Sequence, residues 1–311
     1  MTAPPASRPE DTAAFEAELR RSVTGRVSFD TGTRALYVTD ASNYRRAPLG
    51  VVLPRDADDV EAAMAACRAY GVPLVPRGGG TSVAGNALGG GLLLDTSRHL
   101  TGVGPVDPGE RTIRVLPGAV LDDVRAAAAP YGLTFGPDPS THSRCTIGGM
   151  IGNNACGSHS VAWGTTADNV ESLDVLLADG TRMTVGATSR EEQARLAARP
   201  DRQGRVHAGL RDLTERHLGE LRTGLPALSR RVSGYALDRL LPEHGRHVAR
   251  ALTGSEGTCA VVLGATLKLV EAPAARALAV LGYPDTATAG DAVPGLLEHG
   301  PLTVEGIDRA L

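Results

Sequence analysis

Apolar and polar residues alternate with two different periods along the chain, and they predict strands and helices in succession. Residues 51–53 and 72–75 are short apolar runs, and residues 56–70 between them have the apolar period of an amphipathic helix. Asp56 stands where a helix N-cap is expected, and Gly71 ends the helix. A strand, a helix and a second strand in such close succession predict a βαβ unit with parallel strands.

Other segments predict the remaining elements. In chain order, we expect a helix over residues 11–23, an irregular segment over 24–48, strands at 92–94 and 113–116, and helices over 121–129 and 207–221. Residues 248–252 lead into the segment 254–258. Residues 170–178 alternate and run into Asp179-Gly180, the turn signal of a hairpin whose second strand is 182–185. A final apolar segment covers 261–270, and a new strand and helix begin at residue 278, after a linker at 272–275.

Composition excludes several classes of function. The 311 residues include 38 glycines, 3% are aromatic, and the net charge is −3. A weakly negative chain with few aromatic side chains is not expected to bind nucleic acid. Lys268 is the only lysine, so a P-loop lysine or a Schiff-base lysine can stand nowhere else.

Cysteine spacing and hydropathy predict a cytoplasmic protein. No two of the four cysteines are spaced as a zinc or iron–sulfur ligand pair, so we expect no metal site and reduced, mostly buried thiols at Cys67, Cys145, Cys156 and Cys259. Residues 1–10 are expected to be loose, and the N-terminus lacks the apolar segment of a signal peptide. No stretch is apolar for long enough to cross a membrane, although peripheral attachment to its inner face is an alternative.

A glycine-rich loop directly after the second predicted strand carries the first chemical signal. It reads Arg77-Gly-Gly-Gly-Thr-Ser82, with Gly85 and Asn86 close behind. Glycines expose backbone N–H groups, and such a concavity binds phosphate oxygens. Hydroxyls and the Arg77 charge add to this, so the loop suits a pyrophosphate; a plain glycine-rich turn is the alternative. Neither the Rossmann fingerprint nor the P-loop consensus occurs.

A second segment, about 55 residues further on, carries the complementary signal. Small residues dominate residues 146–157 and would let a flat ring lie close to the backbone. Asn153 and Asn154 offer amides that can pair with ring carbonyls or nitrogens. A tight core turn with buried asparagines is the alternative. We call residues 146–157 the platform. The glycine-rich loop and the platform together suggest a cofactor of dinucleotide size.

Four motifs in a fixed order resemble one superfamily over residues 35–311. Residues 76–85 are similar to the pyrophosphate loop of FAD-linked oxidoreductases of the vanillyl-alcohol-oxidase (PCMH-type) superfamily, and residues 138–154 to its flavin-flanking segment. Residues 163–170 and 254–258 match two more of its stretches. The resemblance is greatest to the D-lactate and D-2-hydroxyglutarate dehydrogenase branch, and within it to the long members that continue into iron–sulfur modules.

The resemblance implies a set of FAD-binding residues. It places the pyrophosphate on Pro76, Arg77, Gly78, Gly79, Gly80, Thr81, Ser82, Gly85 and Asn86. It places the isoalloxazine against Pro139, Thr146, Gly148, Gly149, Ile151, Asn153, Asn154 and Gly157, with Asp168, Asn169 and Val170 on its other flank and Glu256 and Gly257 closing the site. The FAD would be non-covalent, because covalent relatives carry a histidine in the loop where this chain has Thr81 and Ser82.

The implied fold is α+β, a PCMH-type FAD-binding fold of two α/β subdomains with FAD between them. We expect an N-terminal helix and extension over residues 1–34, the FAD-binding domain over 35–272, and the truncated start of a substrate-binding cap domain over 273–311. The subdomains would be a small parallel sheet at about 35–110 and a larger mixed sheet at about 111–272.

The implied function is oxidation of a D-2-hydroxy acid, of the D-lactate or D-2-hydroxyglutarate type, by hydride transfer to FAD. Only the opening of the cap domain, near residues 304–308, is expected here, so the fragment would have weak or no turnover. The alternatives are a non-catalytic FAD-binding module that needs a partner chain, or a different flavin enzyme of the same fold. Expected partners are FAD, the hydroxy acid, and an electron acceptor or a missing cap and iron–sulfur portion.

A few polar residues outside these motifs have less specific interpretations. His142 and Arg144 are candidates for the substrate side, with Arg144 pairing a carboxylate; polar contacts within the loop are the alternative. We expect surface positions for four histidines, namely His207, His217, His244 and His247. Cys145 and Cys156 are expected to be packing residues, and the charged run 190–202 a solvated excursion.

Overall fold

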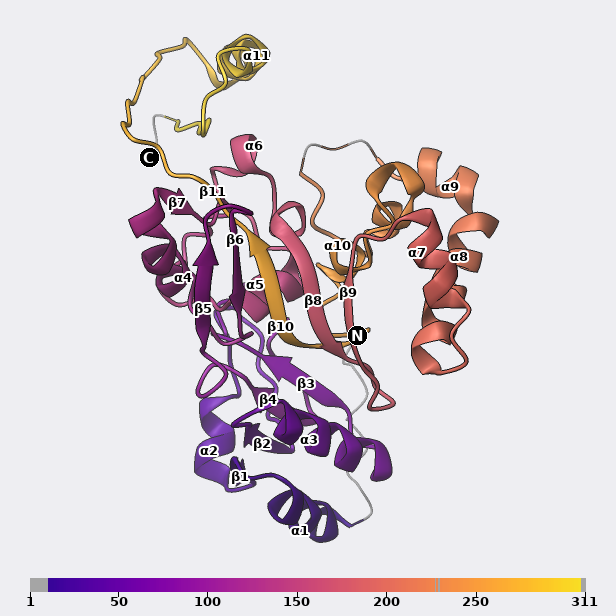
Figure 1. Cartoon of the computed structure of the whole chain (residues 1–311). Coiled ribbons are helices and arrows are strands. Elements are labelled where there is room, and N and C mark those ends of the chain that lie inside the picture. The colour runs from indigo at the N-terminus through magenta and orange to yellow at the C-terminus, as the bar shows by residue number, and fades with distance from the viewer. Residues whose placement is uncertain (1–10, 227, 229, 309–311) are drawn as a thin grey trace.

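Two sheets form the body of the protein (Figure 1), and the computed structural model describes residues 11–226, 228 and 230–308. The first sheet has four strands in the order β1 (Arg26–Ser28), β2 (Gly50–Leu53), β4 (Leu92–Asp95) and β3 (Leu74–Arg77). β2 and β3 both run parallel to β4, which lies between them, and β1 is antiparallel to β2. The predicted βαβ unit is confirmed, with a third strand inserted between its two strands.

Two helices cover the first sheet. In α1 (Thr12–Ser22) and α3 (Ala57–Ala69), the apolar residues recur on one face, and their Phe15, Leu19 and Val60 side chains are buried against the sheet. Asp11 and Asp56 cap these helices with their carboxylates, as expected from a short polar side chain at the N-cap. A short helix, α2 (Thr31–Leu36), precedes β2.

The second sheet is antiparallel throughout. Its strands follow the order β5 (Val103–Asp107), β6 (Thr112–Val115), β10 (Val261–Lys268), β8 (Val170–Leu176) and β9 (Arg182–Gly186). Its core includes side chains of α4 (Leu121–Ala128), α5 (Ile147–Asn153) and α10 (Val248–Leu252). Leu176, Val261 and Leu263 of this sheet belong to the core of the first sheet, so the two sheets are packed together.

The remaining elements lie at the periphery. A lobe beside β9 contains α7 (Arg190–Ala197), α8 (Arg202–Arg216), α9 (Leu218–Thr223) and the 3-10 turns η3 (Leu237–Leu240) and η4 (Pro242–His244) (Figure 1). Shorter elements are η1 (Ala129–Tyr131), β7 (Leu133–Thr134), α6 (Ser160–Trp163), η2 (Ala167–Asn169) and β11 (Val270–Glu271). The last helix, α11 (Thr286–Leu297), stands apart from the body at the top of Figure 1.

Several elements differ from the sequence prediction. Residues 24–48 are not irregular throughout: they contain β1, which pairs with β2, and α2, which Asp30 caps. β5 was not expected, because Pro105 interrupts its alternation of apolar and polar residues. The second sheet is antiparallel rather than mixed, β1 lies before the predicted start of the first subdomain, and β5 belongs to the second sheet.

Two further differences concern the charged run and the C-terminal segment. The run 190–202 contains a regular helix, α7, whose N-cap Ser189 accepts a hydrogen bond from the N–H of Glu192. Residues 278–285 form no strand among the residues described, although α11 follows them as predicted. The expected loose residues 1–10 lie outside the described part of the chain. Within that part, no helix is both long and apolar enough to cross a bilayer.

Candidate functional site

The glycine loop begins where β3, an edge strand of the first sheet, ends at Arg77. Among the described residues, the backbone N–H groups of residues 78–82 donate no hydrogen bond to another protein group. Five successive free donors without bulky side chains form a cradle suited to an anion. This is what the pyrophosphate of a dinucleotide requires, so the loop fits the predicted ligand chemistry.

The loop packs directly on the segment predicted to carry the flavin. A Cβ built at Gly78 would lie 2.1 Å from Thr146 Oγ1, and one at Gly79 would lie 2.3 Å from the carbonyl oxygen of Arg144. No other residue type fits these two positions without a shift of the neighbouring chain. The fold therefore brings the predicted pyrophosphate loop and the predicted flavin platform together.

Arg77 is held by contacts within the protein, and its predicted place beside a pyrophosphate stays a prediction. Its guanidinium donates to the carbonyls of Ala87 and Thr39, each at 3.1 Å, and lies 5.3 Å from the centre of the Tyr37 ring. The Tyr37 hydroxyl in turn donates to the Asp95 carboxylate at 2.7 Å. Burial of the ring is the main cause that raises the pKa of Tyr37, and the hydrogen bond to Asp95 is the second. Arg77 thus holds the two ends of the loop to the segment beside it, as a positioning residue.

The flavin-flanking segment is a short helix with a left-handed end. Thr146 caps α5, and Asn154 ends it with a φ of 48°. The Asn154 side chain is buried: its Oδ1 accepts from the N–H of Ala167 at 2.9 Å, and its Nδ2 donates to the carbonyl of Arg231 at 3.4 Å. Its amide is therefore engaged within the protein, which favours the alternative of a buried structural asparagine; Asn153 is half-buried and stays a candidate.

Asp168 and Asn169 are also held by internal contacts. The Asp168 carboxylate accepts from Thr165 and pairs with Arg239 at 2.9 Å. The Asn169 amide donates to the carbonyls of Trp163 at 2.7 Å and Thr165 at 2.9 Å. These contacts fix the path of the chain into β8, which begins at Val170. Direct contact of these residues with a flavin stays a prediction.

The fold brings residues 254–257 next to α5 and the end of the glycine loop. The N–H groups of Gly254 and Glu256 donate to the carbonyls of Ile151 and Gly152, at 2.8 and 2.9 Å. The Glu256 carboxylate accepts from the amide of Asn86, so the segment also reaches the end of the glycine loop. Glu256 has a φ of 54°, a conformation that costs a non-glycine residue free energy and often occurs at functional sites.

The predicted substrate-side residues lie at the surface near the platform. The His142 ring contacts the Asp122 carboxylate at 2.8 Å, and both side chains are close to half exposed. Arg144 is exposed, and its carbonyl oxygen is the atom that a Cβ at Gly79 would meet. Pro139 accepts the N–H of His142 through its carbonyl at 2.9 Å. Their role toward a substrate stays a prediction.

The structure shows one cluster that the sequence analysis did not identify. His159 contacts the Asp138 carboxylate through Nδ1, donates to it through its backbone N–H at 3.0 Å, and stacks on Trp163 with ring centres 5.0 Å apart. A Cβ at Gly157 would lie 2.2 Å from the carbonyl of Asp138, so this cluster borders the platform. Asp138 and His159 are 21 residues apart, and no local spacing could have indicated their pairing.

Two of the four histidines predicted at the surface are buried. His207, which lies in α8, is 5% exposed, and His247, which is the N-cap residue of α10, is 4% exposed. His247 Nδ1 accepts from the N–H of Arg250 at 3.4 Å, and no described residue is a hydrogen-bond partner of its Nε2. Burial, together with the charges of Arg250 and Arg239, lowers the pKa of His247 to about 4.

This buried histidine predicts a loss of stability in mild acid. In the unfolded chain His247 takes up a proton near its ordinary pKa of about 6.5, whereas the folded protein resists it down to about 4, so stability falls as the pH drops through this window. We expect His247→Asn, which keeps an N-cap acceptor, to reduce the loss between pH 7 and pH 5 by about 1 kcal/mol. Urea unfolding at both pH values measures it. The exposed His244→Asn is the control, and an equal effect of both variants would contradict the prediction.

Comparison with known proteins agrees with the geometry. The family model described as "FAD binding domain" matches residues 48–186, which contain the glycine loop and the platform. The chain contains an FAD-binding domain of the PCMH type. Its cofactor is FAD.

The PCMH-type domain has relatives of several names. The chain is 36% identical to a D-2-hydroxyglutarate dehydrogenase of Pseudomonas putida over 98% of its own length and 30% of that protein. It is 31% identical to a D-2-hydroxyglutarate dehydrogenase of Escherichia coli, with 93% of this chain and 29% of that protein covered. The glycolate oxidase subunit GlcD of Bacillus subtilis is 29% identical, with 92% and 52% covered. The chain thus spans about 30% of the length of the dehydrogenases that it matches.

The PCMH-type fold is also seen in a solved structure. An alkyldihydroxyacetonephosphate synthase superposes with a TM-score of 0.63 at 19% identity, covering 96% of this chain and 53% of that one. At this level of identity the match shows the fold alone. It agrees with the predicted α+β arrangement of two subdomains.

Proposed function

We propose that this chain is the FAD-binding part of an oxidoreductase that oxidises a D-2-hydroxy acid. The observation that carries the proposal is the row of free N–H donors at residues 78–82, packed against the α5 platform. When bound there, FAD would supply the acceptor for the hydride from C2 of the hydroxy acid. The names of the dehydrogenase relatives support the substrate class.

The residues of this chain have distinct tasks in the proposal. The glycine loop binds the pyrophosphate, and Arg77 with Tyr37 fixes the ends of the loop. The chain from α5 to Gly157 supports the ring, and Glu256 with Asn86 closes the site from the other side. His142 and Arg144 face the substrate side, where the Arg144 guanidinium can pair with a carboxylate.

A second candidate is a cofactor-binding module that becomes active only with further protein. The chain covers 30% or less of each dehydrogenase named above. In this case FAD binds as proposed, while the residues that bind the hydroxy acid belong to the further protein. The electron acceptor would be supplied by the same additional part or by a partner.

Visible absorption of the purified chain separates these possibilities. We expect a flavin spectrum that leaves with the small-molecule fraction after acid denaturation, because the loop offers no histidine for a covalent bond. Anaerobic addition of D-2-hydroxyglutarate or D-lactate should bleach the spectrum if this chain is sufficient, and the L-enantiomers are the control. A yellow protein that no hydroxy acid bleaches supports the module. A colourless, folded protein that takes up no added FAD would contradict both.

A further inference from the structure

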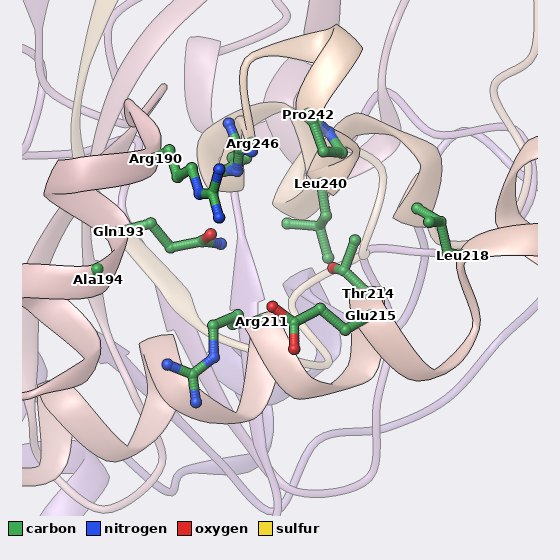
Figure 2. Close-up of a pocket in the computed structure, with 10 residues that line it drawn as sticks. All are labelled: Arg190, Gln193, Ala194, Arg211, Thr214, Glu215, Leu218, Leu240, Pro242 and Arg246. Carbon is green, nitrogen blue, oxygen red and sulfur yellow. The ribbon is translucent and has the colours of Figure 1, made fainter.

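A cavity in the helical lobe lies apart from the FAD site. It encloses about 200 Å³ between α7, α8 and the turn that leads from Leu240 to Arg246 (Figure 2). Its lining combines a polar side with an apolar side and contains none of the residues predicted to bind FAD. The polar lining residues are Arg190, Gln193, Arg211, Thr214, Glu215 and Arg246.

The polar side carries two arginines, Arg190 and Arg246. Hydrogen bonds from its own backbone N–H and from Ser189, and then the charges of these two arginines, lower the pKa of the nearby Glu191 carboxyl. Arg190 and Gln193 project from α7 toward the space that Arg246 faces from the opposite wall (Figure 2). Among the described residues, neither Arg190 nor Arg246 forms an ion pair within 4.0 Å. Arg211 pairs with Asp212 at 2.9 Å and points away from the centre of the cavity, and Glu215 is the one carboxylate of the lining.

Arg246 is held in its place by the backbone. Its φ is 47°, and it follows Gly245, whose φ is 75°. Its N–H donates to the carbonyl of Leu241 at 3.1 Å, and its carbonyl accepts from the Thr188 hydroxyl at 3.5 Å. A left-handed conformation at a non-glycine residue persists only where the surroundings impose it. The backbone of Arg246 is therefore fixed beside the cavity that its side chain lines.

A neighbouring cavity shows that positive charge is not left unpaired throughout the lobe. Its lining includes Arg222 and Arg231, and both are neutralised. Arg222 forms two hydrogen bonds with Glu243, at 2.7 and 3.0 Å, and Arg231 pairs with Asp238. The pair Arg190 and Arg246 thus differs from the other lining arginines of the lobe.

The other side of the cavity is apolar. Leu240 is buried, Leu218 is half-buried, and Pro242 lies close to Leu240, whereas the apolar Ala194 lies on α7 beside Gln193 (Figure 2). Two guanidiniums and an amide at one end match the planar oxygens of a carboxylate, which arginine binds in a bidentate manner. An aliphatic tail would displace water from the leucine side.

We propose that this cavity binds a small organic carboxylate with a short branched aliphatic tail. Arg190 and Arg246 would bind the carboxylate, Gln193 would donate a further hydrogen bond, and the tail would lie on Leu218 and Leu240. The site is separate from the FAD-binding cradle, so the ligand would act as a regulator or a stabiliser rather than as the substrate. A ligand of about eight heavy atoms is expected to bind with a Kd of about 1 mM or lower.

Calorimetric titration of the FAD-saturated chain with 4-methylpentanoate tests the proposal. The double variant Arg190→Gln/Arg246→Gln should weaken binding at least tenfold, because charge-assisted hydrogen bonds are lost. The matched control Arg195→Gln/Arg205→Gln removes two exposed positive charges from α7 and α8 outside the lining and should bind as the wild type does. The neutral analogue 4-methylpentan-1-ol should bind at least tenfold more weakly than the carboxylate.

Three results would overturn the proposal. They are the absence of saturable binding to the wild type in the millimolar range, equal loss in the two double variants, and equal affinity for the alcohol. Circular dichroism and the melting temperature of each variant show whether it is folded. If the double variant does not fold, Ala194→Leu replaces it: the larger side chain fills the cavity, keeps both arginines, and should block binding.

Discussion

Gly79→Ala is expected to lower the affinity for FAD at least tenfold. The added Cβ would lie 2.3 Å from the carbonyl oxygen of Arg144, a backbone atom that cannot turn away as a flexible side chain can. The loop must therefore move off the platform, and the row of N–H donors moves with it. Overpacking of this kind costs about 1–3 kcal/mol, which corresponds to roughly a tenfold to hundredfold change in binding when the strain falls on the bound geometry. Fluorescence titration of FAD with the apoprotein measures the effect.

The control for this prediction is Gly209→Ala in α8. A Cβ at Gly209 meets nothing within 4 Å, so the change adds a good helix former in open space. It should raise stability by up to about 1 kcal/mol and leave FAD binding unchanged. Melting curves of both apoproteins separate a local effect from unfolding. If Gly79→Ala bound FAD as tightly as the wild type does, the glycine loop would not be part of the FAD-binding site.

The sequence was most informative where local chemistry determines the structure. The helices α1 and α3, the hairpin of β8 and β9, and the glycine loop after β3 all follow from caps, turn residues and periodicity. Their causes lie within a few residues of each other, so one segment suffices to predict them. The order of the four motifs then indicated the cofactor.

Contacts between distant segments were not predictable in this way. The central place of β10 between β6 and β8, and that of β4 between β2 and β3, depend on which strands meet after folding. The buried state of His247 depends on helices packed from elsewhere. The hydrogen bonds of the Arg77 guanidinium to the carbonyls of Thr39 and Ala87 were also not predictable, because Thr39 is 38 residues away along the chain.

Asp59→Ala is expected to destabilise the protein by about 3–5 kcal/mol. The carboxylate is 2% exposed and accepts three backbone N–H groups, those of Thr24 at 2.7 Å, Gly25 at 2.9 Å and Arg55 at 2.8 Å. Alanine would leave these donors without an acceptor, and each costs about 1–3 kcal/mol when water cannot replace it. Because the contacts tie α3 to the segment that leads into β1, the base of the first sheet would loosen. Urea unfolding at pH 7 measures the difference.

The adjacent Asp58→Ala is the matched control for this prediction. Both residues lie in the first turn of α3, so both changes remove a favourable charge near the helix N-terminus. The Asp58 side chain is 85% exposed and pairs only at the surface, with Arg182 at 2.5 Å, so its removal should cost less than about 1 kcal/mol. Equal losses in the two variants would mean that charge, rather than the buried hydrogen bonds, accounts for the effect. A large loss confined to Asp59→Ala would show that this one carboxylate anchors the sheet from whose edge strand the glycine loop extends.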